Sequence, residues 1–177
     1  MQSSRVKRSR RLLIVGGLIV AAGIGWGAFR SLNPYVGLKI YKNPARCYAL
    51  SIPGHVQIQA EDLSHVTFAA ADWTGGIQFI DTKLSVADFA KGYEDRIRKE
   101  TPQAIFDPTE NSAGAVRLTS RTDVEGKTVR TVSVFFPGRK SDIVHAYALI
   151  PLPDTSGASS FSDRWLSGFV WDSSCTY

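Results

Sequence analysis

The sequence predicts an α+β domain, in which helices pack against one antiparallel sheet, preceded by a single N-terminal transmembrane helix. Three observations predict this architecture. Residues 12–29 form an apolar run without a charged residue. Short strand-like runs separated by turn residues fill much of the remaining chain, and residues 84–102 have the periodicity of an amphipathic helix. The 177 residues are enough for one domain and a short appendage.

The N-terminus divides into a basic tail at residues 1–11 and a predicted membrane span at residues 12–29. As a helix, the 18 residues of the span measure about 27 Å, close to the ~30 Å hydrocarbon core of a bilayer. Positive charges concentrate before the span, so the tail is expected in the cytoplasm and the domain on the other side. In a bacterium, the span would lie in the inner membrane and the domain in the periplasm. The charges before the span are Arg5, Lys7, Arg8, Arg10 and Arg11.

The basic character of the chain follows from this topology. The net charge is +5 and the sequence pI is about 9.4. Six of the 21 Lys and Arg side chains flank the span, Arg30 being the sixth, so 15 remain in residues 31–177 beside all 16 Asp and Glu side chains, a net charge of −1. The domain therefore lacks the charge distribution of a nucleic-acid-binding protein, and no nucleic-acid partner is expected.

The predicted span can be a retained anchor or a cleaved signal peptide, and we expect retention. A signal-peptide cleavage site needs small residues in an A-x-A-like pattern, which the end of the span matches only approximately. Trp26 is typical of an interfacial anchor, and Gly23 with Gly27 forms a small-xxx-small pair that lets another transmembrane helix approach. Cleavage after residue 23 or 27 is the alternative.

Two cysteines, Cys47 and Cys175, stand near the two ends of the domain. In an oxidising compartment an even number of cysteines favours a disulfide, so we expect these two to pair and to hold the C-terminal tail to the first strand. Two unpaired thiols are the alternative, because sequence alone does not show that the two Cα atoms approach.

After a tether at residues 30–40, the domain is expected to span residues 41–177 and to begin with strands. Residues 47–52 and 56–60 alternate in polarity on either side of a Pro-Gly turn. This pattern predicts a hairpin between them.

A second pair of short strands, residues 66–71 and 77–81, is followed by the predicted internal helix. Ser85 is a suitable N-cap for this helix, and Pro102 lies just beyond its end. The expected apolar stripe consists of Val86, Phe89, Ala90, Tyr93 and Ile97.

Three further strand-like runs follow at residues 115–122, 127–136 and 141–150, joined by turn-like segments. They predict a meander of antiparallel strands. In residues 161–173 aromatic side chains recur every four residues, which predicts a closing helix that covers the sheet.

No motif in the sequence predicts catalysis. The nucleophile elbow, the dinucleotide fingerprint and the P-loop are all absent. His55, His65 and His145 are scattered and lack the spacing of a metal site. The best metal arrangement would bring His55 and His65 together with Glu61 or Asp62, but we expect no metal and no cofactor.

The Gly-rich turn between the second pair of strands carries two further candidates. Asp72 and Asp81 flank it, and although two carboxylates can do acid-base chemistry, a structural role at strand ends is the expected one. Trp73 lies on this turn and is a candidate partner contact, since exposed aromatic residues are favoured as contact anchors. Packing of Trp73 onto its own sheet is the alternative.

The order of elements resembles that of the PsbP-like family, named for an extrinsic protein of photosystem II. The resemblance lies in the segment YKNPARCYALSIP at residues 41–53, the short hairpins, the capped helix, the meander containing Gly126 and the aromatic final helix. It covers about residues 41–171, and His55 stands near the place where the family often has a tryptophan. The resemblance implies an α/β sandwich that serves as a non-catalytic binding or assembly module beside membrane complexes.

Together these observations predict an accessory subunit anchored by one membrane span. Its partners would be the membrane and other membrane protein subunits, contacted through the Gly-bearing span and one face of the domain. The alternative is a stand-alone periplasmic protein, released by signal cleavage, that captures a small ligand or neutralises an effector.

Overall fold

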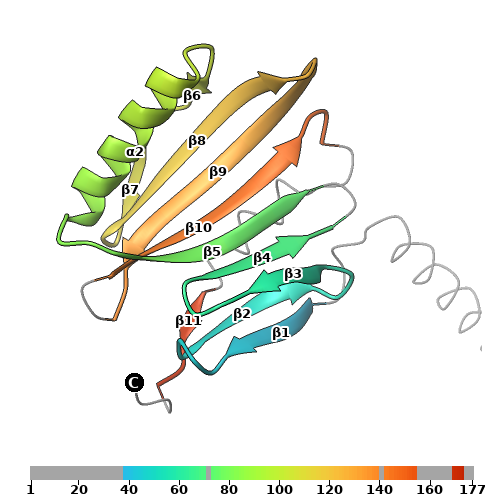
Figure 1. The fold of residues 1–177 in the computed structure, drawn as a ribbon, viewed down its shortest axis with the longest axis vertical. Coiled ribbons are helices and arrows are strands. Elements are labelled where there is room, and N and C mark those ends of the chain that lie inside the picture. Colours follow the sequence, from blue (N-terminus) through green and yellow to red (C-terminus); the bar gives the residue numbers. More distant parts are fainter. Residues whose placement is uncertain (1–37, 71–72, 140–141, 155–168, 174–177) are drawn as a thin grey trace, which may run out of the picture.

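The computed structural model describes residues 38–70, 73–139, 142–154 and 169–173, which form two antiparallel sheets and one α-helix (Figure 1). The α+β class is confirmed. The predicted span at residues 12–29 lies outside the described residues, and no helix within the described part is long and apolar enough to cross a membrane.

The large sheet has the strand order β3-β4-β5-β10-β9-β8-β6, and β7 also pairs with β8. Its strands are β3 (Gln57–Glu61), β4 (His65–Ala69), β5 (Thr74–Asp81), β6 (Ile105–Phe106), β7 (Glu110–Ser112), β8 (Ala115–Val124), β9 (Lys127–Pro137) and β10 (Asp142–Pro151).

The predicted meander is confirmed as β8, β9 and β10, which pair antiparallel in chain order. The β8–β9 turn consists of Glu125 and Gly126, both with positive φ (52° and 77°). Two successive residues with positive φ form the tight turn that matches the twist of paired strands.

The small sheet has the order β1-β2-β11 and comprises β1 (Leu38–Asn43), β2 (Tyr48–Pro53) and β11 (Val170–Trp171). The predicted hairpin between residues 47–52 and 56–60 is therefore wrong, because β2 pairs with β1 and β11 while β3 pairs with β4. The turn after β2, closed by the Val56 amide donating to the Pro53 carbonyl at 3.1 Å, leads the chain from one sheet to the other.

Two other predicted boundaries change. Strand β1 begins at Leu38, so the last residues of the predicted tether are part of the sheet. The predicted closing helix lies largely outside the described residues, and Val170–Trp171, near its expected end, form β11 beside β2 instead. Pairing with β2 directs Trp171 toward Phe79, with ring centroids 6.4 Å apart.

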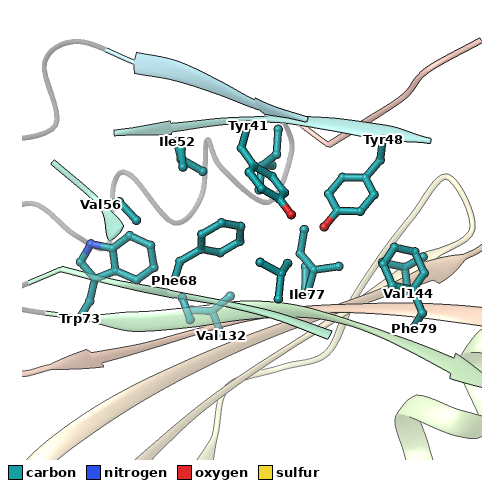
Figure 2. Packing of buried hydrophobic residues seen from close by; sticks show 14 of the residues in the cluster. Tyr41, Tyr48, Ile52, Val56, Phe68, Trp73, Ile77, Phe79, Val132 and Val144 are labelled. Carbon is teal, nitrogen blue, oxygen red and sulfur yellow. The ribbon is translucent and has the colours of Figure 1, made fainter. Parts of the chain in front are cut away.

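The main core fills the space between the two sheets (Figure 2). Tyr41 and Tyr48 project from the small sheet toward Phe68 and Ile77 of the large sheet, and the rings of Tyr41 and Phe68 meet edge to face at 5.4 Å. All four side chains are less than 9% exposed. Burial of such aromatic and aliphatic surface is the main stabilising term that holds the two sheets together.

The opposite face of the large sheet carries helix α2 (Val86–Glu100), which lies along β8 and β9 (Figure 1). The predicted N-cap is confirmed, because the Ser85 hydroxyl accepts a hydrogen bond from the Asp88 amide at 3.1 Å. The predicted apolar stripe faces the sheet, where Phe89 and Tyr93 contact Phe135. Helix α2 thus covers part of this face, and the rest of the face forms the candidate site.

Candidate functional site

A groove with a volume of about 540 Å³ lies beside helix α2 on the large sheet. The first half of α2 packs closely on the sheet through Ala90, which is 1% exposed. The second half, with Ile97 and the C-cap residue Thr101, forms one wall. The other lining residues are Gln78, Tyr93, Phe106, Leu118, Ser120, Thr122, Val124, Val129, Thr131, Ser133, His145, Tyr147 and Leu149.

The alternation of side chains along the strands explains this lining. On β10, Val144, Ala146 and Ala148 point into the core between the sheets, so His145 and Tyr147 point to the α2 side. Every second residue of β8 and β9 faces the groove in the same way. The α2 face of three adjacent strands therefore presents polar side chains beside aliphatic ones.

The floor of the groove contains a buried histidine and serine. The Nε2 atom of His145 lies 3.1 Å from the Ser133 hydroxyl oxygen, and the two residues are 5% and 2% exposed. The His145 ring stacks on Phe135, with centroids 4.4 Å apart. Burial, with a smaller effect from the Arg96 charge, lowers the pKa of His145 to about 4, so this imidazole is neutral near pH 7.

Tyr147 connects the floor to β4. Its hydroxyl lies 3.1 Å from Nε2 of His65, whose ring is nearly parallel to the tyrosine ring, and Thr67 lies 3.3 Å from the same nitrogen. The ring of Tyr147 lies over Gly76, where a Cβ atom would stand 2.7 Å from the Tyr147 hydroxyl oxygen. A glycine at this position therefore lets Tyr147 lie across β5. Burial raises the pKa of Tyr147 above its ordinary value.

Ser120 and Thr131 are direct cross-strand partners on β8 and β9, and both line the groove. Ser120 is 8% exposed. The hydrogen bonds of the described residues include none from the Ser120 hydroxyl, which distinguishes it from Ser133. The Ser120 residue is buried, but its hydroxyl oxygen is not among the fully covered unpartnered atoms of the described residues, so it can bond to a molecule that fills the groove.

The lining within the described residues is uncharged. Arg96 and Arg98 lie outside it and place their guanidinium groups over the rings of Tyr93 and Phe106, at 5.2 and 4.3 Å from the centroids. These cation–π contacts hold two walls of the groove in place. The groove therefore presents hydroxyl, imidazole and aromatic groups with no net charge.

Chemically, this arrangement is suited to binding. A serine beside a histidine is the start of a nucleophilic pair, but such a pair needs a third group to orient the imidazole. Among the described residues no carboxylate bonds to His145, and Ser133 is almost fully covered. No group of three potential metal ligands occurs among them either.

The predicted contact residue Trp73 lies elsewhere, in the core between the sheets, where it is 3% exposed (Figure 2). The prediction that Trp73 is a partner contact is therefore wrong, and the alternative, packing onto its own sheet, is what the structure has. Its ring packs over Gly75, where a Cβ atom would come within 2.8 Å of it.

Other predicted site residues fall outside the described part of the chain. These are Arg5, Lys7, Arg8, Arg10, Arg11, Gly23, Trp26, Gly27, Asp72 and Cys175. Cys47 is buried, and the described residues include no free thiol. The pairing of Cys47 with Cys175 stays a prediction, because Cys175 is not described.

The candidate metal arrangement around His55 and His65 is not assembled. Glu61 accepts hydrogen bonds from Tyr41 and Asn43, and Asp62 accepts from the Ser64 and His65 amides, which lowers its pKa. Nε2 of His65 is directed to Tyr147 instead. Asp81 is exposed at the end of β5.

The sequence did not predict a groove, although one signal was present. Ser133 and His145 are polar residues inside otherwise apolar, β-branched and aromatic runs. In such a strand a polar residue indicates a face with a polar partner or a cavity. The sequence does not show that both positions lie on one face, because that depends on strand register.

No family model matches the chain, and no curated protein matches its sequence. Among solved structures, the Ran-binding protein Mog1p of Saccharomyces cerevisiae aligns with a TM-score of 0.61 at 9% identity, over 78% of this chain and 97% of Mog1p. CyanoP, the cyanobacterial PsbP of Synechocystis, aligns with a TM-score of 0.54 at 14% identity, over 77% and 95% of the two chains. A protein of unknown function from Pseudomonas aeruginosa aligns with a TM-score of 0.52 at 16% identity, over 75% and 96%. The domain therefore has the α+β fold of Mog1 and PsbP-like proteins.

Proposed function

We propose that this protein is a non-catalytic accessory subunit, anchored in the bacterial inner membrane by one span, whose periplasmic domain helps to stabilise a larger membrane protein complex. The observation that supports this proposal is the position of the first strand of the domain. Strand β1 begins at Leu38, so only residues 30–37 separate the domain from the predicted span. A link of this length keeps a domain beside the bilayer and beside any neighbouring membrane subunit.

One of the solved structures of this fold is named as a binding protein, which is compatible with the proposal. Mog1p carries the name of a Ran-binding protein, and CyanoP is a PsbP protein. At 9% and 14% identity we transfer the fold to this chain and leave their partners aside. The contact with another span would use Gly23, Gly27 and Trp26, and the proposed Cys47–Cys175 disulfide would fasten the tail.

The proposal is tested by isolating the full chain from its native membranes in mild detergent. We expect an intact mass that includes residues 12–29 and co-migration with larger subunits on a native gel. The double variant Gly23→Leu/Gly27→Leu should release the protein from the complex, because bulky side chains prevent close helix approach. Gly25→Leu is the matched control, since Gly25 lies roughly 160° around the helix from both Gly23 and Gly27. Migration of the wild-type protein alone would overturn the proposal.

A second candidate function, capture of a small ligand, is favoured by the groove beside α2. Its volume of about 540 Å³ lies within the usual range for small-molecule sites. If the N-terminal sequence of the mature protein begins after residue 23 or 27 and the protein is free of membrane, ligand capture becomes the main function.

A further inference from the structure

The groove floor has three buried polar residues, and the hydroxyl of one of them, Ser120, is available for a hydrogen bond to a ligand. Ser133 and His145 bond to each other at 3.1 Å. Ser120 is 8% exposed and lines the groove, and among the described residues its side-chain hydroxyl makes no hydrogen bond. Covering a hydroxyl without a partner is unfavourable, so an occupant that fills the groove must supply a donor or an acceptor there.

The walls of the groove indicate what the apolar part of a bound ligand would be. Ile97, Phe106, Val129, Leu149 and the ring of Tyr147 supply aliphatic and aromatic surface around the polar floor. Flat apolar groups pack well against such walls, and aromatic walls favour stacked or edge-to-face rings.

The uncharged lining of the groove disfavours charged ligands. Among the described residues no charged side chain lines the groove, and the guanidinium groups of Arg96 and Arg98 beside it lie over the rings of Tyr93 and Phe106. A carboxylate, phosphate or ammonium group in this groove would lose water without an ion-pair partner among the described lining residues, which costs several kcal/mol.

We infer that the groove binds an uncharged small molecule that has a ring and a hydrogen-bonding group, with this group meeting the Ser120 hydroxyl. The inference rests on the second candidate function, ligand capture, and does not depend on the membrane anchor. It names the chemical class that the groove selects.

Three probes of nearly equal shape test the class at pH 7. Benzamide is neutral, benzoate is an anion and benzamidinium is a cation, and all three have the same ring. The full chain in mild detergent, isotope-labelled at histidine and tyrosine, is titrated with each probe, and the NMR shifts of His145 and Tyr147 are followed. We expect benzamide to shift both signals with a dissociation constant at least about tenfold lower than those of the two charged probes.

Two variants and a control localise the binding. Ser120→Ala removes the available hydroxyl and should weaken benzamide about fivefold. Thr131→Phe keeps a residue that favours strands but fills the groove, and should abolish the shifts. Ser112→Ala makes the same chemical change at an exposed position on β7 and should bind like the wild type.

The outcomes separate the inference from the function on which it rests. If benzoate or benzamidinium binds as tightly as benzamide, the inferred ligand class is wrong while ligand capture stands. If benzamide shifts persist unchanged in both Ser120→Ala and Thr131→Phe, the probe binds outside the groove and the inference is overturned. If no probe shifts either signal, both the inference and the second candidate function are overturned.

Discussion

His145 illustrates, at the scale of a single residue, how burial changes chemistry. The ring is enclosed by Phe135, Tyr93 and Tyr147, with centroids 4.4, 5.2 and 5.3 Å away. Its charged form would lose most of its water and would face Arg96, and these two causes lower its pKa to about 4. In the unfolded chain the same imidazole has a pKa of about 6.5. The unfolded chain therefore binds this proton first as the pH falls.

The unfolding free energy should depend on pH through His145. Its contribution should be complete above about pH 7 and fall as the pH drops from about 6.5 toward 4, by up to about 3 kcal/mol in total. Urea unfolding of the full chain at several pH values, with His145→Gln as the reference, measures it. The variant should lack this part of the slope, and identical slopes would contradict the prediction.

Gly76 is a second residue with a specific role. A Cβ atom there would lie 2.6 Å from the Val66 carbonyl oxygen and 2.7 Å from the Tyr147 hydroxyl oxygen. Gly76→Ala should therefore displace Tyr147, break its contact with His65 and lower the unfolding free energy by about 2 kcal/mol.

Gly92→Ala provides the opposite control for this measurement. Gly92 lies inside α2, and nothing stands within 4 Å of its would-be Cβ atom. Alanine should stabilise the helix there by about 0.5–1 kcal/mol. If Gly76→Ala and Gly92→Ala unfold at the same urea concentration, the close contacts at Gly76 do not exclude a Cβ atom there, and the prediction is wrong.

At the scale of elements, α2 is positioned by its cap and by its apolar stripe. The Ser85 hydroxyl accepts from the Asp88 amide and donates to the Asp88 carboxylate at 2.7 Å. Ser85→Ala should lower the unfolding free energy by about 1 kcal/mol. Ser112→Ala, an exposed serine on β7, should leave it unchanged. A cap variant as stable as this control would show that packing alone sets the start of α2.

Three parts of the fold with local signals were predicted correctly. Helix α2, the pair β4 and β5, and the β8–β9–β10 meander depend on caps, turns and periodicity, which act between residues close in the chain. Strands β2 and β3 were recognised as strands, but their partners were not. A strand alternates in the same way in either sheet, so its pattern does not identify its neighbour.

At the scale of the whole molecule, Glu61 helps to join the two sheets. It stands at the end of β3, the edge of the large sheet, and accepts from the Tyr41 hydroxyl at 2.5 Å and from the Asn43 amide at 3.1 Å, both on β1. Burial, followed by this bond to Glu61, raises the pKa of Tyr41 to about 12.

Removal of this link should destabilise the whole domain. Glu61→Ala leaves Tyr41 and Asn43, which are 7% and 5% exposed, without their shared acceptor, and should cost about 1–2 kcal/mol. Urea unfolding followed by tryptophan fluorescence measures the loss. Glu100→Ala, at the exposed end of α2, is the matched control and should be neutral. Equal midpoints would show that core packing alone joins the sheets.

The α+β class, the boundaries of α2 and the order of the meander can be predicted from the sequence, because periodicity, caps and tight turns are local. Three features become visible only in the folded domain: the N-terminal strands form a separate sheet, Trp73 lies in the core, and one groove is lined by Ser120, Ser133, His145 and Tyr147. These features depend on strand pairing and on which face α2 covers. Both are set by burial of apolar surface between segments far apart in the chain, which no local pattern records.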